Sequence, residues 1–361
     1  MTDSPASLSP AFVPAAWSVP AVLAVDGGGT KTAAVRVAQD GQIQGYYTTS
    51  GSNPFDQPDW QQILSDLVLP LSTGVQAAAF GLAGYGENRA LGQTIRTHLH
   101  TLCPDGTLSL SLSNDVDMAC TGAFAGNAGV LLLSGTGSMA WAHDGNGNTA
   151  RVGGWGGTFG DEGSAYWIGR TALQFICQAL DGRKPEAVGF AQAVCTHMGW
   201  PTTAPAAMDA LLGWHAEQPR PRSAVAQCAR LVDELAEAGC VQATALLKDA
   251  AAQLAAHIHT ARARLGGDTL PWSYAGSVFN SPRIRAELTA LCGAPQLPIL
   301  APLGGGVLRA ARQAGWSIDS QWIATLAQSL KNLPSSHPVH PPPVGRNNAA
   351  LSSNGAASDV G

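Results

Sequence analysis

Two glycine-rich turns that carry hydroxyl side chains are the parts of this sequence best suited to chemistry. The first is Asp26-Gly-Gly-Gly-Thr30 and the second is Ser134-Gly-Thr-Gly-Ser138, and each follows a short apolar segment. Adjacent glycines let the backbone approach a polyphosphate closely, and Thr and Ser hydroxyls add hydrogen-bond donors. Asp26 can hold a metal ion and its waters against the phosphates. The pair of turns therefore predicts a phosphate site, with plain hairpin turns as the alternative.

Neither turn fits a common nucleotide-binding motif. A P-loop requires G-x-x-x-x-G-K-[ST] before a helix, whereas Lys31 and Thr32 follow Gly29 at the wrong spacing and precede a strand. The spacing G-x-G-x-x-A at residues 135–140 matches the dinucleotide-binding fingerprint, but the sequence that follows predicts a strand and not a helix. The helix N-terminus that would hold a pyrophosphate is then missing. We therefore expect two β-hairpin phosphate clips rather than a dinucleotide site.

The elements that must position these turns are repeated along the chain. Apolar segments at Val22–Val25 and Ala33–Val37 flank the first turn, and segments at Val130–Leu133 and Met139–His143 flank the second. Each set is a strand–turn–strand unit. This approximate internal duplication predicts two α/β halves, and we expect the two glycine turns to face a cleft between them.

Further strands and helices are expected in each half. We predict strands at Gln42–Thr48, Ala77–Leu82, Leu108–Leu112, Trp272–Ala275 and Ile299–Ala301. Helices are predicted at Trp60–Leu71, Asn88–Leu99, Arg283–Leu291 and Val307–Ala314, the last opened by Gly304-Gly305-Gly306, and the Ala-rich stretch from Ser164 to about Leu265 is largely helical. The expected organisation is a flexible arm at 1–19, domains at 20–118 and 119–331, and a disordered tail at 332–361.

The composition excludes several other classes of protein. A chain of 361 residues suits about two domains. Charged residues make up 12%, the net charge is −5 and there is no basic run, so neither nucleic acid nor a membrane is an expected partner. A phosphorylated ligand is still compatible, because backbone amides can hold phosphate. The seven cysteines are scattered and never form C-x-x-C, which indicates reduced thiols in a cytoplasmic protein without a zinc or iron–sulfur site.

Four motifs together resemble the N-acetylglucosamine kinase family, within the broader BadF/BadG/BcrA/BcrD ATPase group. They are Asp26-Gly-Gly-Gly-Thr-Lys-Thr32, Ser134-Gly-Thr-Gly-Ser138, Gly153-Gly-Trp-Gly156 and Gly160-Asp-Glu-Gly-Ser-Ala-Tyr-Trp-Ile168, and the resemblance runs in order from Val22 to Ala314. It implies an α/β, two-domain actin-like ATPase (ribonuclease H-like) fold. An interdomain cleft would close over ATP, Mg²⁺ and an amino sugar, and the protein would be a homodimer.

The resemblance gives Asp115 the central chemical role. Phosphoryl transfer needs an aligned hydroxyl, a proton acceptor and charge neutralisation. In similar kinases the Asp at this place accepts the proton of the attacking sugar hydroxyl and contacts the sugar. The alternative is that Asp115 caps a helix, although Asp117 is the better candidate for that cap.

The resemblance also implies the residues that contact each ligand. For the sugar these are Asn53, Gly154, Trp155, Gly156 and Asp161, with a turn residue as the alternative for Asn53 and a core residue as the alternative for Trp155. For ATP they are Gly28, Gly29, Thr30, Lys31, Thr136 and Gly137 at the phosphates and Gly276, Ser277, Gly304 and Gly305 on the nucleoside side. Asp26 is the metal ligand. Ala83-Gly84 stands where relatives often carry Ser-Gly, so one sugar contact is absent.

The leading hypothesis is therefore an ATP-dependent kinase that transfers the γ-phosphate to the 6-hydroxyl of N-acetylglucosamine or glucosamine. One alternative is an ATPase activator of a radical dehydratase, which needs cysteines near the nucleotide, and Cys120 is the only nearby candidate. The other is a sugar-sensing protein without catalysis, which the presence of both Asp26 and Asp115 disfavours. The motifs do not identify which amino sugar is bound.

Overall fold

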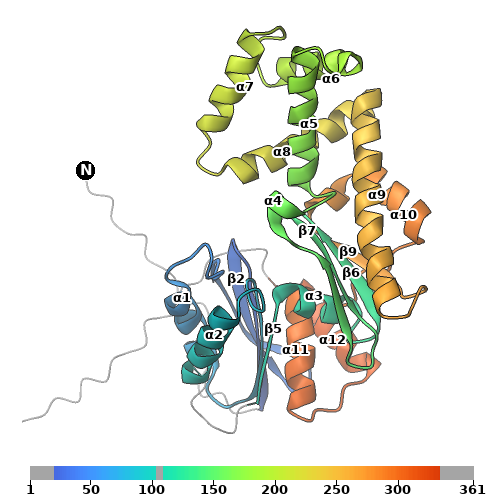
Figure 1. Ribbon diagram of the computed structural model, residues 1–361. Helices are drawn as coiled ribbons and strands as arrows, with labels where there is room; N and C mark the ends of the chain where they lie inside the picture. Colours follow the sequence, from blue (N-terminus) through green and yellow to red (C-terminus); the bar gives the residue numbers. More distant parts are fainter. Residues whose placement is uncertain (1–19, 103–108, 334–361) are drawn as a thin grey trace, which may run out of the picture.

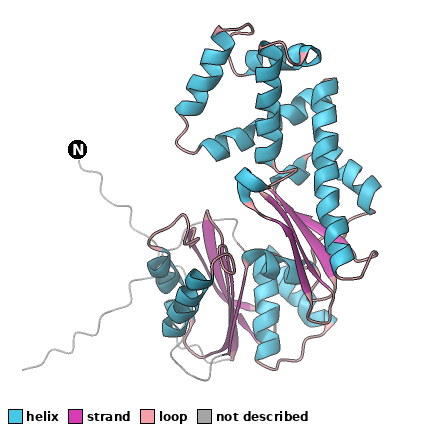
Figure 2. Ribbon diagram, viewed as in Figure 1, coloured by secondary structure: helices cyan, strands magenta, loops and turns pink. Residues whose placement is uncertain are grey.

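The computed structural model of the protein describes residues 20–102 and 109–333 (Figure 1). The arm predicted at 1–19, the tail from residue 334 onward and the first residue of the strand predicted at Leu108–Leu112 lie outside these ranges. The described chain folds around two separate β-sheets with helices packed against them (Figure 2).

The first sheet has five strands in the order β3-β2-β1-β4-β5. Strands β1 (Ala21–Gly27), β2 (Lys31–Ala38) and β3 (Ile43–Ser50) form an antiparallel meander. Strands β4 (Val75–Leu82) and β5 (Ser109–Ser113) run parallel to β1. Strand β1 is buried on both faces, with Val22 and Ala24 in one hydrophobic cluster and Leu23 and Val25 in another. This explains its nearly continuous apolar sequence.

The second sheet repeats this arrangement with four strands in the order β8-β7-β6-β9. Strands β6 (Gly129–Ser134), β7 (Ser138–His143) and β8 (Thr149–Gly153) form the antiparallel meander, and β9 (Trp272–Ala275) pairs parallel to β6. The order β8-β7-β6-β9 corresponds strand for strand to β3-β2-β1-β4. The duplication predicted from the two glycine turns is therefore confirmed in the topology of the sheets.

Helices cover the two sheets unequally. Helices α1 (Trp60–Val68) and α2 (Arg89–Leu102) pack on one face of the first sheet, and α11 (Pro302–Gln313) and α12 (Ser320–Lys331) pack on its other face. Helix α9 (Val241–Arg264) lies along the second sheet, and most of the other helices gather at its far end, away from the first sheet (Figures 1 and 2). These other helices are α4 (Gly156–Phe159), α5 (Ala165–Leu180), α6 (Val188–His197), α7 (Ala206–Ala216), α8 (Pro221–Glu237) and α10 (Pro282–Cys292).

Helices α3 (Asp115–Ala123) and α11 lie between the two sheets, where they cross each other with their backbones in contact. A Cβ added to Gly305 would lie 2.1 Å from the Met118 carbonyl oxygen, and one added to Gly122 would lie 2.7 Å from the Ala301 carbonyl oxygen. Only glycine allows two helices to approach this closely. The crossing therefore explains why α11 carries three successive glycines near its start.

Two local predictions for this region are wrong. The segment Ile299–Ala301 is not a strand, because the Ile299 and Leu300 N–H groups donate to the Ala123 and Gly122 carbonyls at the end of α3, at 3.0 and 3.1 Å. The last helix of the predicted set begins at Pro302 rather than after the glycines. Proline favours the first helical position, so the glycines lie inside the helix.

The last two helices return to the first sheet. Leu303, Val307, Trp322 and Leu326 belong to the same hydrophobic cluster as Val22 on β1. The predicted assignment of all residues from 119 to 331 to the second half differs from this packing, and the predicted boundary at 118/119 falls inside α3. The chain thus passes from the first sheet to the second and returns.

Candidate active site

Asp26 and Asp115 lie at the same edge of the first sheet. Asp26 is the penultimate residue of β1, and Asp115 opens α3 directly after β5. Because β1 and β5 are both parallel to β4, their carboxyl ends meet at one edge, which is where ligands bind in such sheets. The N-cap of α3 is Asn114, whose side chain accepts from the Val116 N–H at 3.0 Å. The prediction that Asp117 provides this cap is therefore wrong.

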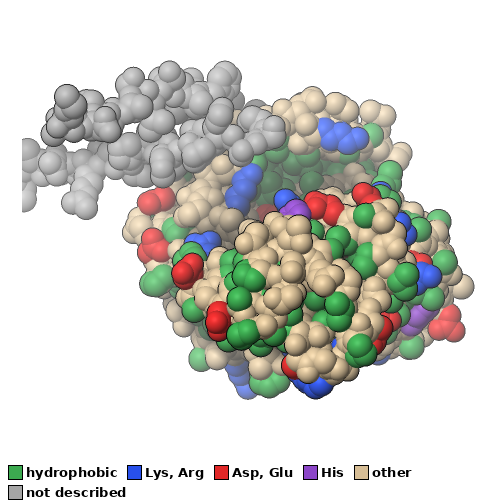
Figure 3. All heavy atoms as spheres, turned by 90° about the horizontal axis from the view of Figure 1, so that it is seen from above, with side chains coloured by type: hydrophobic (Ala, Val, Ile, Leu, Met, Phe, Trp, Pro, Cys, Tyr) green, Lys and Arg blue, Asp and Glu red, His purple; other side chains and the backbone are tan. Residues whose placement is uncertain are grey.

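Both carboxylates line one cavity of about 480 Å³ between the two sheets. Lys31 and Gly28 of the first turn lie on one side of it, and Leu131 and Leu133 of β6 lie on the other. Ala301, Pro302 and Leu303 of the returning segment complete the wall. Seen from above, the molecule is hollowed, and acidic and basic side chains lie beside the hollow (Figure 3). The cavity is the expected cleft, with residues from both halves.

The pKa of each carboxyl is raised. Burial raises the pKa of Asp26 to about 7, the charge of Asp115 adds to this effect, and Lys31 opposes it. Burial also raises the pKa of Asp115 to about 6, against the hydrogen bond from the Val116 N–H. Two carboxyl groups that titrate near neutrality in a cleft are typical of a functional site. They leave a negative charge that a bound cation would stabilise.

The first glycine turn is fixed from behind by the segment that follows β3. The Gly28 N–H donates to the Lys31 carbonyl at 2.9 Å, and the Ser52 N–H donates to the Gly28 carbonyl at 3.0 Å. A Cβ on Gly51 would lie 2.1 Å from the Gly29 carbonyl oxygen. The tip of the turn, including Lys31, is exposed. The turn is thus held rigidly while its tip can contact a ligand.

The second turn is held by a buried carboxylate. The Ser138 N–H donates to Oδ1 of Asp161 at 3.2 Å, and the Ser138 hydroxyl donates to the Glu162 carbonyl at 2.7 Å. The other oxygen of Asp161 is paired with Arg222, and Asp161 is only 2% exposed. A sugar contact by Asp161, as predicted from the resemblance, would require these interactions to change. Thr136, at the tip, is exposed.

A second cavity of about 230 Å³ adjoins this turn. Thr136 lies at one side of it, and Ser277 and Val278 lie at another, between α5, α8 and α10. Gly276 has φ of 112°, and a Cβ there would lie 2.1 Å from the Ser134 carbonyl oxygen, so it packs directly on the second turn. Thr136, predicted for the phosphates of ATP, and Ser277, predicted for its nucleoside, therefore line the same cavity.

Gly304 and Gly305 do not line the second cavity, which differs from their predicted place on the nucleoside side. Both are buried at the start of α11. Gly305 faces the backbone of α3, and Gly304 faces the side chains of Leu300 and Leu330. Their lack of a side chain serves helix packing.

The four remaining sugar-site candidates lie in the loop after β3 and between the end of β8 and the start of α4, outside the first cavity's lining. The Asn53 amide donates to Asp56 at 2.9 Å and accepts from the Phe55 N–H at 3.2 Å, which forms a local turn. Trp155 is 71% exposed between Gly154 and Gly156, both of which have positive φ. The alternative that Trp155 is a core residue is therefore wrong.

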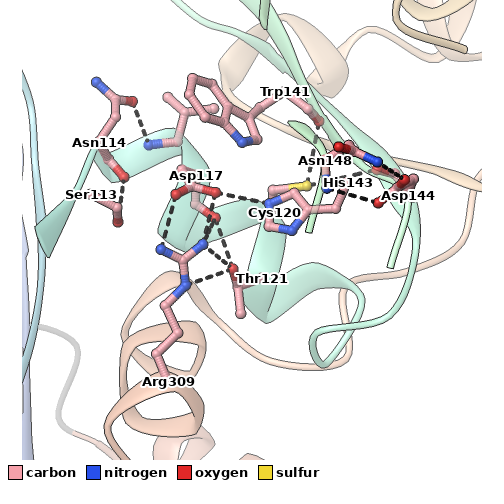
Figure 4. A network of polar contacts seen from close by, with 12 residues as sticks. Ser113, Asn114, Asp117, Cys120, Thr121, Trp141, His143, Asp144, Asn148 and Arg309 are labelled. Atoms are coloured by element: carbon pink, nitrogen blue, oxygen red, sulfur yellow. Dashed lines mark hydrogen bonds and ion pairs between the residues drawn. The ribbon is translucent and has the colours of Figure 1, made fainter. Parts of the chain in front are cut away.

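A network around Asp117 joins three elements, and the sequence did not predict it (Figure 4). Asp117 on α3 accepts from Arg309 on α11 at 2.7 and 2.9 Å and contacts His143 on β7 at 2.8 Å. Burial alone would raise the pKa of Asp117, but these hydrogen bonds outweigh it and lower the pKa to about 2. The network ties the crossing helices to the second sheet. Arg309 is too distant in sequence from Asp117 for any local pattern to indicate the pair.

The described residues contain no cluster of three or more His, Cys, Asp or Glu side chains arranged to hold a metal ion. Asp26 and Asp115 are the two carboxylates of the cleft. Among the same residues, no helix has both the length and the apolar character required to cross a membrane.

Comparison with known proteins identifies the family. The model of the BadF/BadG/BcrA/BcrD ATPase family matches residues 23–293. The chain belongs to this family. A curated N-acetylmuramic acid/N-acetylglucosamine kinase from Clostridium acetobutylicum is 28% identical over 182 residues, and an N-acetyl-D-glucosamine kinase from Dictyostelium discoideum is 26% identical over 185 residues. Each alignment covers less than half of this chain (46% and 45%) and 56% of the relative.

Solved structures confirm the predicted fold. A candidate N-acetylglucosamine kinase from Chromobacterium violaceum superposes with a TM-score of 0.62 at 27% identity, over 81% of this chain and 99% of that chain. A hexokinase of the ROK family from Thermus thermophilus superposes with a TM-score of 0.51 at 15% identity, over 82% and 99%. The family member described here thus has the actin-like ATPase fold.

Proposed function

We propose that this ATPase-family protein is an amino-sugar kinase that transfers the γ-phosphate of ATP to the 6-hydroxyl of N-acetylglucosamine or glucosamine. The observation that carries the proposal is the cleft in which Asp26 and Asp115 face one cavity with raised pKa values. Both curated relatives are named as kinases of N-acetylglucosamine, and one of them also of N-acetylmuramic acid.

ATP would lie across the second half of the molecule. Its base would occupy the cavity beside Ser277, and its phosphates would extend over Thr136 and Gly137 toward the first turn. Gly28, Gly29, Thr30 and Lys31 would then contact the terminal phosphate from the opposite side. Backbone N–H groups and hydroxyls from both turns suit this task because phosphoryl transfer depends on positioning and charge stabilisation.

Asp115 would accept the proton of the attacking hydroxyl. A general base is most effective when its pKa lies close to the working pH, and burial brings the pKa of Asp115 to about 6. Asp115 is the first residue of α3, which fixes its backbone, and it lines the cavity in which the ligands would bind.

The residues of the cleft fit a bound Mg²⁺. Magnesium sites commonly use one or two carboxylates together with substrate phosphates and water. Asp26 would hold the ion, because burial and the charge of Asp115 raise its pKa by more than Lys31 lowers it, and a cation would stabilise the ionised carboxylate. When bound, Mg²⁺ would neutralise phosphate charge.

The sugar would be held between the two loops that carry Asn53 and Trp155. Gly154 and Gly156 bring the backbone of the second loop close, and the exposed Trp155 ring offers a flat face to a sugar. Asp161 would join this contact only after release from Ser138. A homodimer, expected from the resemblance, remains a prediction that sedimentation can test.

Two other functions are disfavoured. An activator of a radical dehydratase needs an accessible cysteine pair, whereas Cys120 is buried, with burial raising its pKa to about 12. A sugar sensor without catalysis would not need two carboxylates poised near neutrality in one cleft.

The test is ADP release by the full-length protein with ATP, Mg²⁺ and a panel of amino sugars, with glucose as the control. We expect turnover with N-acetylglucosamine or glucosamine well above that with glucose, and a product whose ³¹P–¹H correlation places the phosphate on C6. Sugar-independent ATP hydrolysis, or a phosphate at C1, would contradict the proposal.

A further inference from the structure

Arg222 lies at the second glycine turn but belongs to none of the four motifs that indicated the candidate site. It lies in the first turn of α8, and its guanidinium pairs with the buried Asp161. The same guanidinium lies against Gly137, because a Cβ on Gly137 would be 3.1 Å from Nη2 of Arg222. A cation thus contacts the turn over which the phosphates of ATP would extend.

The exposure of the pair is unequal. The Asp161 side chain is 4% exposed, whereas the Arg222 side chain is 51% exposed. Asp161 is fully committed to the protein through Ser138 and Arg222, but guanidinium has five donors in a planar fork. Among the contacts of the described residues, the Arg222 guanidinium donates one hydrogen bond, from Nη2 to Asp161. Its other donors can bind a further anion.

The neighbours of Arg222 hold it in place. Its Cζ lies 5.8 Å from the centre of the Tyr166 ring, and a Cβ on Gly157 would be 3.4 Å from Nε. Ser223, the next residue of α8, lines the cavity proposed for the base of ATP. The α8 N-terminus adds a favourable field for negative charge. Arg222 is therefore positioned at the boundary between the base cavity and the phosphate turn.

We infer that Arg222 binds the phosphates of ATP from the second half of the molecule, opposite Lys31 on the first, while its pairing with Asp161 fixes the turn. This inference rests on the proposed function in that it assumes a nucleotide at the second turn. It adds a nucleotide-binding residue and gives the buried Asp161 carboxylate, which also accepts from the Ser138 N–H, the role of positioning that residue.

The test compares the binding of ATP and adenosine to the full-length protein by calorimetry. Adenosine shares the base and ribose but has no phosphates. Because a charge-assisted hydrogen bond contributes about 10- to 100-fold in affinity, Arg222→Gln should weaken ATP by at least tenfold and leave adenosine unchanged. Arg222→Lys should restore part of the loss. Arg220→Gln, two residues away, is the matched control and should bind ATP like the wild type, because the Arg220 side chain is exposed and has no described hydrogen bond or ion pair.

A double variant separates direct binding from structural support. In Arg222→Gln with Asp161→Asn, the buried carboxylate is neutralised, so a purely structural role of Arg222 would be rescued. We expect the preference for ATP over adenosine to stay lost in the double variant. Recovery of ATP affinity in it, or equal weakening of ATP and adenosine in Arg222→Gln, would overturn the inference while the kinase proposal stands. A wild-type protein that binds no ATP would overturn both.

Discussion

Asp115 lies close enough to Asp26 for its negative charge to raise the pKa of the Asp26 carboxyl. The two residues are far apart in the sequence, and the parallel pairing of β1 and β5 with β4 brings them to one edge. Burial is the larger cause of the raised pKa of both carboxyls, because neither group is solvated well enough to stabilise its charge. A nucleotide and its counterion, bound as proposed, would therefore reduce the repulsion between these two carboxylates.

Asp115→Asn should abolish most turnover. The amide keeps the shape of the side chain but cannot accept the hydroxyl proton, so kcat should fall by about 10²- to 10⁴-fold. The Kd for ATP should stay within about twofold, since Asp115 is assigned to the sugar side. Asp66→Asn, on the exposed face of α1, is the control and should retain full activity. Undiminished kcat in Asp115→Asn would remove this residue from the mechanism.

The rate should depend on pH through Asp115. Only the ionised carboxylate accepts a proton, and burial raises its pKa to about 6. We expect kcat/KM to rise from pH 5 and to level off above pH 7, with an apparent pKa near 6 in initial-rate measurements at saturating Mg²⁺. A profile that is flat from pH 5 to pH 8 would argue against an essential carboxylate with this pKa.

Asp26→Asn should stabilise the protein at high pH. The folded-state pKa of Asp26 is about 7 and the ordinary value is 3.8, so the folded state binds more protons between these pH values. The free energy of unfolding therefore decreases as pH rises through this window. At pH 8 and without nucleotide or metal, the variant should exceed the wild type by on the order of 1–3 kcal/mol. The gain should shrink toward pH 4.

Thermal unfolding at pH 8 and pH 5 measures this effect. Wild type and variant should differ in Tm by several degrees at pH 8 and much less at pH 5. The same variant should lose kinase activity, because Asp26 is the proposed metal ligand. A variant that is less stable than the wild type at pH 8 would show that the Asp26 charge is compensated in the folded protein.

The sequence was sufficient for the two glycine turns and the strands that flank them, because apolar runs interrupted by Gly-Thr turns have few other interpretations. It did not indicate β8, and it wrongly predicted a strand at Ile299–Ala301. It was insufficient at Gly305. A glycine just before a predicted helix can belong to the turn that precedes the helix, or it can lie inside the helix and allow close packing against another one. The choice depends on α3, which lies far away in the chain and presents its backbone there. Asp117 is a similar case. Its position suits a helix cap, but Arg309 from the returning helix takes the carboxylate.

The shared cavity of Asp26 and Asp115 could be predicted from the strands around them, whereas their roles in it stay predictions. Asp26 and Asp115 each end a strand of one parallel set, so their meeting follows from the topology. Asp161 had no such constraint. Its motif indicates a ligand contact, whereas Ser138 and Arg222 surround it in the fold. The sequence alone cannot show whether a carboxylate such as Asp161 contacts a ligand or other residues of the protein, because the choice depends on which partner lies nearer in the fold.

Gly51→Ala should disturb the first turn. A Cβ at residue 51 would lie 2.1 Å from the Gly29 carbonyl oxygen, so the turn must move. We expect a stability loss of about 1–3 kcal/mol and a higher KM for ATP in steady-state assays. Gly213→Ala is the matched control, because α7 has open space there, and alanine should stabilise the helix by about 0.5–1 kcal/mol. An unchanged KM in Gly51→Ala would mean that the turn does not touch the nucleotide.

Asp117→Asn should loosen the connection between the two halves. Arg309 and His143 would lose a buried carboxylate, which costs about 2–4 kcal/mol when a buried ion pair is broken. Because the pKa of Asp117 is lowered to about 2, its contribution to stability is present above pH 4 and is lost as pH falls toward 2.

Urea unfolding of the wild type and Asp117→Asn at pH 7 and pH 3.5 should therefore show a difference in the free energy of unfolding that narrows at the lower pH. Asp181→Asn is the control, since its pair with Arg183 has side chains 42% and 67% exposed and should contribute little to stability. If the two variants lose the same stability at pH 7, the Asp117 network does not hold α3, α11 and β7 together.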